Sequence, residues 1–422
     1  MVFNDRYLAD RFIDPVFNAS IEDDTLKELI SITRRFSREK VLPKAEEMEK
    51  KKQIDDDLVE EMRRLEIFGY SIPAEYGGQG LGIIGDCLSI FEIAYGDMST
   101  SLVPLVTNSL FAKAVMIGGN KKQKEDILPK VVAGELLGCY ALTDPGGSSF
   151  SRDMETNLKK KGDMYILKGN KRFISEADKA DLAVVFARLE DYDDKFVGIL
   201  VPNKHSDKTQ GFYNIKKGYE VIKKENKPGI HASATCEIVM EDMEIPPENI
   251  LGYDFDGEKG YAIAMQTLGY SRPTIAAQAL GNAKHSLSCL MTYATEIVRG
   301  RGKYLIDIPE FRESTVILSG KLSESISYLL NIAKAITKGD IAADKILRIH
   351  SSMLKKLGTD TGELVCKECL CMVGGYGYTE DYPFSRLWRD SLVPRIYEGH
   401  NDVQVYQAGK TLGKILEELR EK

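Results

Sequence analysis

The stretch GGYGYTEDYPFSRLWRDSLVPRIYEGHNDVQ, residues 374–404, joins a glycine-rich turn, an Arg/Asp cluster and one carboxylate, Glu398. The glycines let the backbone approach a large ligand closely, but their spacing does not suit the strand-to-helix loop of a dinucleotide-binding fold. Glu398 follows the apolar pair Ile396 and Tyr397 and precedes Gly399. Partial desolvation there should raise the pKa of Glu398 toward the range of a general base. The alternative is a glutamate that only favours the N-terminus of the following helix.

In the rest of the chain, apolar residues recur with the period of a helix near both ends and at every second position, as in a strand, in the middle. Helices are predicted over residues 26–36 and 56–67, and further apolar stripes run over 322–336 and, through Ile346, Met353 and Leu357, from residue 346 onward. In the middle, residues 164–168 and 171–175 predict a hairpin around a Gly169-Asn170 turn. Further strands are predicted over residues 183–187, 196–201 and 235–240.

Helices, then strands, then helices indicate a mostly helical α+β fold and not the alternating order of a parallel sheet. The predicted parts are an N-terminal helical domain over residues 1–138, a central β-barrel-like domain over 139–252 and a C-terminal four-helix bundle over 253–422. The segment Gly80-x-Gly82-x-x-Gly85 matches the dinucleotide fingerprint, but it follows a helix and Pro73, and Leu105 stands where a ribose-binding acid is needed. We interpret it as a connecting loop.

Composition excludes several classes of protein. The 422 residues are 43% hydrophobic, enough for substantial cores, and the net charge of −7 argues against general nucleic-acid binding. The longest uncharged run, residues 98–112, is too short to span a bilayer, so no membrane span is expected. The N-terminus has neither a secretory apolar core nor an acid-poor transit composition, which predicts a cytoplasmic protein.

The seven cysteines do not form a disulfide framework in so long a chain. Cys366, Cys369 and Cys371 are spaced like metal ligands, but no second cysteine pair follows and the five histidines are scattered. We therefore expect no metal site there and a buried helix that uses cysteine as a small hydrophobe.

The stretch at residues 374–402 resembles the acyl-CoA dehydrogenase signature G-G-x-G-Y-x-x-x-x-P-x-x-R-x-x-R-D followed by I-Y-E-G-T. The resemblance implies that Glu398 removes the α-proton of a fatty-acyl thioester while FAD takes a hydride from the β-carbon. It also implies that Gly399 contacts substrate. His400 replaces the threonine that contacts FAD in this family. The implied FAD contacts of this stretch are Gly374, Gly375, His400 and Asp402.

Two segments of the predicted β domain resemble flavin-binding motifs of the same family. Residues 140–149, YALTDPGGSS, resemble A-L-T-E-P-G-A-G-S-D, with Phe150 in place of the next aspartate of the motif. Residues 171–175, KRFIS, resemble K-x-W-I-T, which implies that Phe173 shields the flavin ring and that the Ser175 hydroxyl binds it. On the residues alone, the two segments are a turn and an ordinary strand. For residues 140–149, the resemblance implies flavin contacts from Tyr140, Leu142, Thr143, Ser148 and Ser149. It also implies that Ser149 contacts the CoA moiety of the substrate.

Residues near the start of the C-terminal helices complete the implied substrate contacts. In some branches of the family the catalytic glutamate stands at the position of Ser271, and serine cannot serve as that base at neutral pH, so the choice falls on Glu398. Arg272 matches an arginine near the substrate, and an ion pair between helices is the alternative for it. Further upstream, His231 replaces an arginine of the motif G-x-R-x-S-x-T, and we expect a surface histidine without a role.

The segment 301–312 is the weakest part of the resemblance, because Leu305 removes a glycine. In the family its counterparts reach the FAD pyrophosphate of a neighbouring subunit. Arg301 is retained, Tyr304 replaces phenylalanine and Arg312 replaces glutamine. A guanidinium suits phosphate geometry, so we hypothesise that Arg312 or Lys303 supplies compensating positive charge.

The resemblance covers the whole chain and implies an FAD-dependent acyl-CoA dehydrogenase that forms an enoyl-CoA, passes electrons to electron-transfer flavoprotein and assembles as a homotetramer. Two alternatives within flavin chemistry are an acyl-CoA oxidase and an enoyl-CoA reductase. A third alternative is a non-catalytic helical binding protein that keeps the fold. The acyl group stays open, because residue types alone do not give the depth of a cavity.

Overall fold

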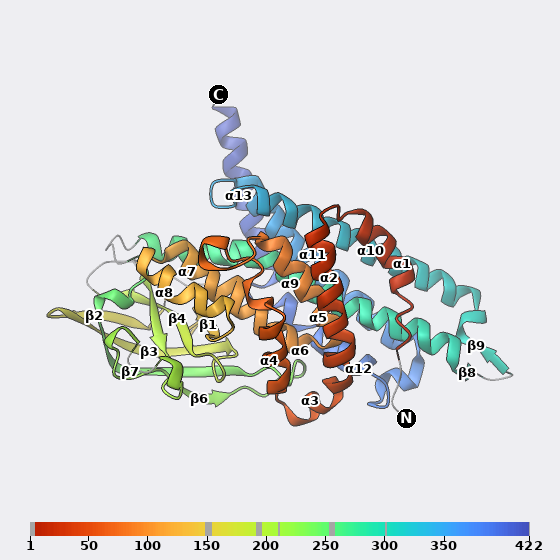
Figure 1. The fold of residues 1–422 in the computed structure, drawn as a ribbon. Coiled ribbons are helices and arrows are strands. Elements are labelled where there is room, and N and C mark those ends of the chain that lie inside the picture. The colour runs from red at the N-terminus through yellow and green to blue at the C-terminus, as the bar shows by residue number, and fades with distance from the viewer. Residues whose placement is uncertain are drawn as a thin grey trace.

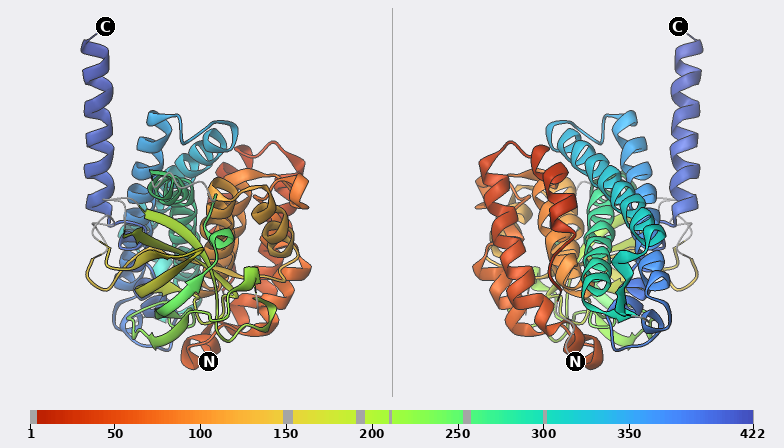
Figure 2. Two further views of the ribbon diagram at one scale, coloured as in Figure 1. Left: turned by 90° about the vertical axis from the view of Figure 1, so that its left-hand side faces the viewer. Right: turned by 90° about the vertical axis from the view of Figure 1, so that its right-hand side faces the viewer.

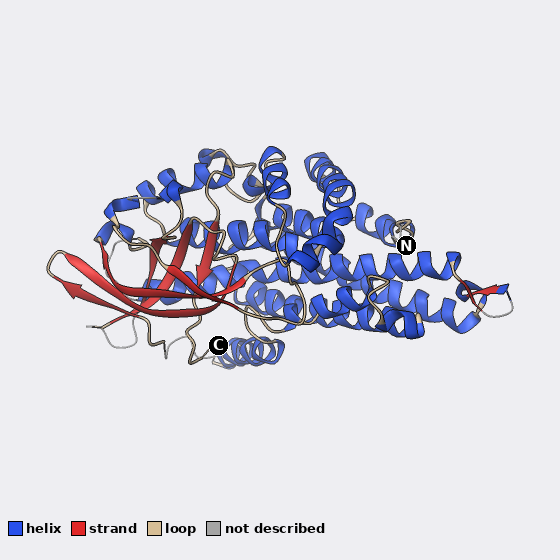
Figure 3. Cartoon of the chain, turned by 90° about the horizontal axis from the view of Figure 1, so that it is seen from below, coloured by secondary structure: helices blue, strands red, loops and turns tan. Residues whose placement is uncertain are grey.

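A curled sheet lies at one end of the molecule, and long helices run from it to the other end (Figure 1, Figure 3). The computed structural model describes residues 5–147, 154–190, 196–209, 212–252, 258–299 and 302–421. Helices come first along the chain, strands follow, and helices return to the C-terminus, which is the predicted order.

The N-terminal helices pack around the apolar helix α5. Helix α2 begins where the Asp23 carboxylate accepts hydrogen bonds from the amides of Thr25 and Leu26, and it confirms the helix predicted over residues 26–36. The helix predicted over residues 56–67 ends at Arg64, and a 3₁₀ turn follows over Ile67–Gly69. The helices of this part are α1 (Asp10–Ala19), α2 (Asp24–Phe36), α3 (Ala45–Lys51), α4 (Asp56–Arg64), α5 (Gly82–Gly96), α6 (Met98–Pro104), α7 (Lys113–Gly118) and α8 (Lys121–Val132).

One continuous helical run, Met98–Gly118, is longer than the uncharged stretch noted in the sequence. It comprises α6, a π-helical segment over Leu105–Ala112 and α7. Its 21 residues are long and apolar enough to cross a membrane, yet 78% of its most apolar window is buried inside the molecule. Such burial is typical of a core helix, because a membrane span presents its apolar side chains outward.

The central sheet is mixed. Its strands are β1 (Gly138–Ala141), β2 (Asn157–Lys161), β3 (Met164–Ser175), β4 (Leu182–Leu189), β5 (Phe196–Pro202), β6 (Glu220–Lys224) and β7 (Thr235–Ile245). The strand order is β1-β4-β2-β3-β7-β6, with β5 paired to β4. Strand β4 runs parallel to β1 and β2, and the other pairings are antiparallel. Strands β4, β5 and β7 confirm three predicted strands.

The predicted hairpin around Gly169-Asn170 is wrong. Strand β3 runs straight through both residues, which pair with Met240 and Val239 of β7. The hairpin lies earlier, between β2 and β3, where Lys161 pairs with Met164. Gly169 stands at a shift in register, with φ of 149°, and a Cβ on it would lie 2.5 Å from Thr156. Gly169 therefore marks a bulge and a close approach of the strand to Thr156. In the sequence alone, such a glycine looks the same as a turn glycine.

The C-terminal part consists of long helices packed side by side. Its helices are α9 (Glu258–Glu296), α10 (Pro309–Lys338), α11 (Lys345–Met372), α12 (Phe384–Asp390) and α13 (Asn401–Arg420). Helices α9 and α11 pack closely because α11 carries Gly358 and Gly362 at the contact, where a Cβ would lie 2.8 Å from Ala276 and 2.9 Å from the Ala279 carbonyl oxygen. Helix α13 projects away from the body of the molecule (Figure 2).

The apolar stripe predicted at the start of α11 is on the wrong face. Ile346 and Leu357 are 46% and 47% exposed. The buried face of α11 instead carries Ser351, Leu354 and Lys355, together with the two glycines. At Gly358 and Gly362 the face has no side chains because α9 approaches the backbone of α11 too closely there.

Candidate active site

Glu398 lies in a tight turn between a 3₁₀ turn over Val393–Arg395 and helix α13. Glu398 and Gly399 both have left-handed backbone conformations, with φ of 52° and 91°. A left-handed conformation costs free energy in a residue with a side chain, so neighbouring contacts must fix it. Helix α13 begins at Asn401, three residues after Glu398, and the preceding His400 accepts a hydrogen bond at Nδ1 from the Asp402 amide at 3.2 Å. Glu398 therefore precedes the helix and is not part of its first turn.

Two side chains hold the carbonyl groups of this turn. Lys355 Nζ donates a hydrogen bond to the Gly399 carbonyl oxygen at 2.9 Å. Gln404 Nε2 donates to the carbonyl oxygens of Glu398 and Gly399 at 3.2 and 3.1 Å. A Cβ at position 399 would lie 2.3 Å from Gln404 Nε2. The turn therefore requires glycine after the glutamate, because a side chain would displace the amide that holds it.

The two carboxylate oxygens of Glu398 have different surroundings. Oε2 accepts a hydrogen bond from the Ser271 hydroxyl of α9 at 2.5 Å. Oε1 is shielded from solvent and has no hydrogen-bond partner among the described residues. Burial raises the pKa of Glu398 to about 7, while the Ser271 hydrogen bond and the charges of Arg272 and Lys355 oppose that rise. Near neutral pH the carboxyl group is thus poised to exchange a proton.

Arg272 lies beside this carboxylate on α9. Its Nη1 donates to Ser352 Oγ of α11 at 3.0 Å, and its Nε is buried without a partner among the described residues. Burial lowers the pKa of Arg272 to about 10, and the nearby Glu398 opposes that change. Among the described residues Arg272 forms no ion pair, so the alternative of an ion pair between helices is not what the structure shows.

The β domain approaches the same carboxylate through Tyr140 of β1. The Tyr140 hydroxyl donates to the Ala264 carbonyl oxygen of α9 at 3.2 Å. Burial raises the pKa of Tyr140, and the charge of Glu398 adds to that rise. Next along the chain, the Thr143 carbonyl oxygen accepts from the Arg172 amide at 2.8 Å, so the segment after β1 lies against the bend at Phe173 in β3. Tyr140 therefore lies near the predicted base, and Thr143 lies beside the bend at Phe173.

Other predicted residues lie far from Glu398 within one chain. The Tyr376 ring contacts Tyr293 of α9 with centroids 6.5 Å apart, so the glycine turn at 374 and 375 lies near the end of that helix. Ser271 lies 22 residues earlier, about 33 Å along the helix at 1.5 Å per residue. Tyr304 and Arg312 lie farther out, at the hairpin β8 (Val298–Arg299) and β9 (Lys303–Tyr304) and the start of α10, opposite the sheet (Figure 3). Ser148, Ser149 and Arg301 lie outside the described residues.

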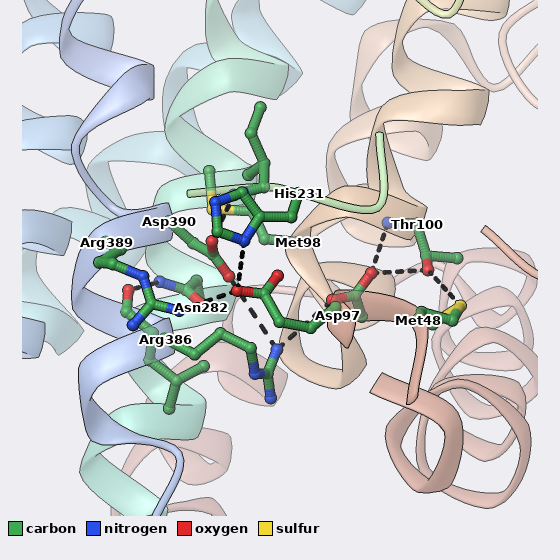
Figure 4. Close-up of polar contacts among 12 residues, drawn as sticks. Met48, Asp97, Met98, Thr100, His231, Asn282, Arg386, Arg389 and Asp390 are labelled. Atoms are coloured by element: carbon green, nitrogen blue, oxygen red, sulfur yellow. Dashed lines mark hydrogen bonds and ion pairs between the residues drawn. The ribbon is translucent and has the colours of Figure 1, made fainter. Parts of the chain in front are cut away.

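The Arg/Asp cluster of the signature joins all three parts of the chain (Figure 4). Arg386 of α12 pairs with Asp97 of the N-terminal part at 3.4 Å, and Arg389 pairs with Glu49 at 2.8 Å. His231 of the β domain, expected at the surface without a role, also contacts Glu49, with Nδ1 2.8 Å from its Oε1 and a side chain only 23% exposed. The expectation of a surface histidine is wrong, because the ring is partly buried against Glu49 and the Lys227 carbonyl oxygen.

One group of potential metal ligands exists in the described part of the chain: Asp5, His285 and Cys289, whose ligand atoms lie within 4.8 Å of one another. The Asp5 carboxylate already accepts hydrogen bonds from Tyr95 and Ser288, and burial raises the pKa of the Cys289 thiol well above its ordinary value. A thiol is a poor ligand compared with a thiolate, so we interpret the group as a tether for the N-terminal segment.

Two of the three cysteines of α11 match the interpretation as buried small hydrophobes, and the third does not. Cys366 and Cys369 are buried, and Cys371 is exposed. Cys366 Sγ accepts a hydrogen bond from Asn282 of α9 at 3.4 Å.

Comparison with known proteins gives the same assignment along the whole chain. Models of acyl-CoA dehydrogenase domains match three consecutive parts: the N-terminal domain over residues 23–135, the middle domain over 139–243 and the C-terminal domain over 258–413. An acyl-CoA dehydrogenase of Bacillus subtilis strain 168 is 31% identical over 376 residues, which are 88% of this chain and 94% of that protein. The chain belongs to the acyl-CoA dehydrogenase family.

Solved structures of the family have the same fold. Butyryl-CoA dehydrogenase from Megasphaera elsdenii matches with a TM-score of 0.85 and 29% identity, over 93% of this chain and 99% of that one. An acyl-CoA dehydrogenase from Bacillus anthracis complexed with FAD matches with a TM-score of 0.82 and 25% identity, over 94% of this chain and 68% of that one. The predicted fold class is confirmed, and the chain is an oxidoreductase with a flavin cofactor.

The residues of this acyl-CoA dehydrogenase fit a flavin. Phe173 has a left-handed backbone, φ of 60°, and its ring is 55% exposed although it stands in a strand. Such a ring offers an apolar face to a planar ligand. Among the described residues, the hydroxyl groups of Thr143 and Ser175 form no hydrogen bond, so both are available to the polar edge of the ring system. The bend that exposes Phe173 is the same one that interrupts the pairing of β3 with β7.

Lys355, Gln404 and Glu49 are functional candidates that the sequence did not reveal. Lys355 lies on a face that was predicted to be polar, because the apolar stripe was assigned to the other side of α11. Gln404 lies one helical turn after the signature glutamate turn, and a lone glutamine carries no signal. Glu49 belongs to a run of charges, EEMEKKK, in which buried and exposed members look the same.

Proposed function

We propose that this chain catalyses the FAD-dependent α,β-dehydrogenation of an acyl-CoA thioester to the enoyl-CoA, with Glu398 as the base that removes the α-proton. The observation that supports the proposal most is the unequal pair of carboxylate oxygens. Ser271 fixes Oε2, whereas the shielded Oε1 has no partner in the described residues and is available to accept a proton. A carboxyl pKa of about 7 suits a base that works near neutral pH.

The thioester carbonyl makes the α-hydrogen acidic, and donors to its oxygen stabilise the negative charge that develops there. The amide of Glu398 forms no backbone hydrogen bond among the described residues, so it is available as such a donor. Arg272 adds positive charge near the same centre, with its Nε unpaired. When bound, the flavin accepts the hydride that leaves the β-carbon. The chain itself orients the carboxylate, supplies the donors and keeps water from the reacting atoms.

The reaction is tested by adding acyl-CoA to the purified flavoprotein without oxygen. We expect butyryl-CoA or a longer or branched acyl-CoA to bleach the visible flavin absorbance and to yield one equivalent of the matching enoyl-CoA by mass spectrometry. Bleaching by none of a panel that includes cyclic, aryl and dicarboxylic acyl groups would contradict the proposal. Stoichiometric oxygen uptake during aerobic turnover would show an oxidase instead.

We infer that reduced enzyme passes its electrons to electron-transfer flavoprotein, in the cytoplasm, and that the chain works as a homotetramer. The distance between two groups of predicted flavin-binding residues in one chain supports the homotetramer. Tyr304 and Arg312 lie opposite the sheet, so they contribute to a flavin site only if a second copy brings them there. The projecting helix α13 also exposes a row of apolar side chains: Val405, Leu412, Leu416 and Leu419 are 41%, 46%, 56% and 63% exposed.

Light scattering after size-exclusion chromatography tests the assembly. We expect four copies for the native chain and fewer for a Leu412→Lys and Leu416→Lys double variant, because two charges disrupt an apolar contact. A Lys410→Glu and Lys414→Glu variant changes the same helix on its charged side and should keep the mass. A native chain that is monomeric with a full complement of flavin would contradict the proposal.

A further inference from the structure

Lys355 is a buried amine that lies next to the predicted catalytic turn. Its side chain is fully buried in α11, and Nζ donates hydrogen bonds to the Gly399 carbonyl oxygen and to Asn401 Oδ1, both at 2.9 Å. Among the described residues it forms no ion pair with a carboxylate. Burying an ammonium group without a counter-ion costs several kcal/mol, so such a lysine indicates a function beyond packing.

The acceptors of Lys355 are themselves fixed. Asn401 Nδ2 donates to Thr359 Oγ1 at 3.0 Å and to Asp360 Oδ1 at 2.8 Å, which leaves its Oδ1 directed at Lys355. The Gly399 carbonyl belongs to the left-handed turn that carries Glu398. The lysine therefore connects a rigid helix to the one strained turn of the site, and the strain persists only while such contacts hold it.

The charge of Lys355 also acts on the carboxylate. Burial lowers the pKa of Lys355 to about 7, and the charge of Glu398 opposes that shift more than any other group. In the other direction, Arg272 and Lys355 are the two charges that lower the pKa of Glu398. The remaining ionisable groups that face the pair are Asp360 on α11, Arg395 before the turn, Tyr140 of β1 and Tyr397.

We propose that Lys355 is a positioning residue for the removal of the α-proton: it fixes the turn that aims Glu398 through the Gly399 carbonyl, and its positive charge favours the ionised carboxylate. The inference rests on the proposed function of Glu398. The Gly399 carbonyl and Asn401 take two of the three ammonium hydrogens, and the proposed role needs no contact between Lys355 and the substrate.

The test compares Lys355→Met and Lys355→Arg with Lys367→Met, which removes an exposed charge from the same helix. The dependence of kcat/KM on pH is measured between about pH 6 and pH 10. For Lys355→Met we expect the acidic limb to move up by about one pH unit, which lowers kcat/KM about 5-fold at pH 7 and not at high pH. The misplaced turn should add a loss that does not depend on pH, with kcat changed more than KM. Lys355→Arg should keep the acidic limb, and Lys367→Met should match the native enzyme.

A second readout does not depend on turnover. The carboxyl band of Glu398, identified by its absence from Glu398→Gln in infrared difference spectra, should titrate about one pH unit higher in Lys355→Met. A uniform loss of rate at all pH values, with an unmoved carboxyl titration, would show a merely structural role and overturn the inference. If Glu398→Gln itself kept normal turnover, the proposed function would fail first, so the two failures are distinguishable.

Discussion

Replacing Ser271 by alanine removes the one donor that hydrogen-bonds the Glu398 carboxylate among the described residues. The hydroxyl lies 2.5 Å from Oε2 and stabilises the ionised form of the group. Without it the carboxylate is less stable, so the pKa of Glu398 rises. The rate of proton removal then falls at neutral pH and recovers as the pH rises through the new pKa, because the base must be ionised to act.

The size of the effect follows from the hydrogen bond. A hydrogen bond to a charged group contributes about 1.5–3 kcal/mol, and one pKa unit corresponds to about 1.4 kcal/mol. The pKa of Glu398 should therefore rise by about one to two units from its value of about 7. At pH 7 the ionised fraction falls from roughly one half to about 1–10%, which is a loss of about 5- to 50-fold in kcat/KM.

The assay is kcat/KM against pH for Ser271→Ala, with Ser351→Ala as the matched control. Ser351 is also buried, but its hydroxyl donates only to the Gly269 carbonyl oxygen, so its removal should leave the profile in place. A Ser271→Ala profile that falls equally at every pH, or whose acidic limb coincides with that of the native enzyme, would refute the reasoning.

Two further predictions concern stability. Glu49→Ala leaves Arg389 without its carboxylate at the junction of the three parts, and should lower the free energy of unfolding by about 1–3 kcal/mol in a denaturant titration, whereas no loss would show that the junction contributes little. Gly362→Ala places a Cβ 2.9 Å from the Ala279 carbonyl oxygen and should lower the free energy of unfolding by about 1–3 kcal/mol. Gly320→Ala has open space around it and should raise the free energy of unfolding by about 0.5–1 kcal/mol. Equal effects of the two substitutions would contradict the close packing of α9 and α11.

The sequence predicts the order of the elements and the pKa of Glu398 because both depend on local patterns. Apolar spacing located α2 and the strands β4, β5 and β7. The predicted partial desolvation of Glu398 agrees with its raised pKa, although Ile396 itself is 60% exposed. Such local patterns can be read without knowing which distant residues pack against them. The reaction and its cofactor were predicted from the family resemblance instead.

Other features depended on distant contacts and were missed. The Gly169-Asn170 pair resembles a hairpin turn, but β7 pairs with both residues and Thr156 occupies the space of a side chain. Lys355 was missed because the helix α9, 83 residues away at Arg272, determines which face of α11 is buried. His231 was misjudged for the same reason, since its partner Glu49 lies 182 residues earlier in the chain.

The most direct measurement is the turnover of Glu398→Gln, a variant that keeps the shape of the side chain and removes its basicity. We expect native flavin content, native binding of the enoyl-CoA product and a fall in kcat of at least about 100-fold, because general-base catalysis contributes that much or more. Near-normal turnover in a variant with full flavin content would contradict the assignment of Glu398 as the base.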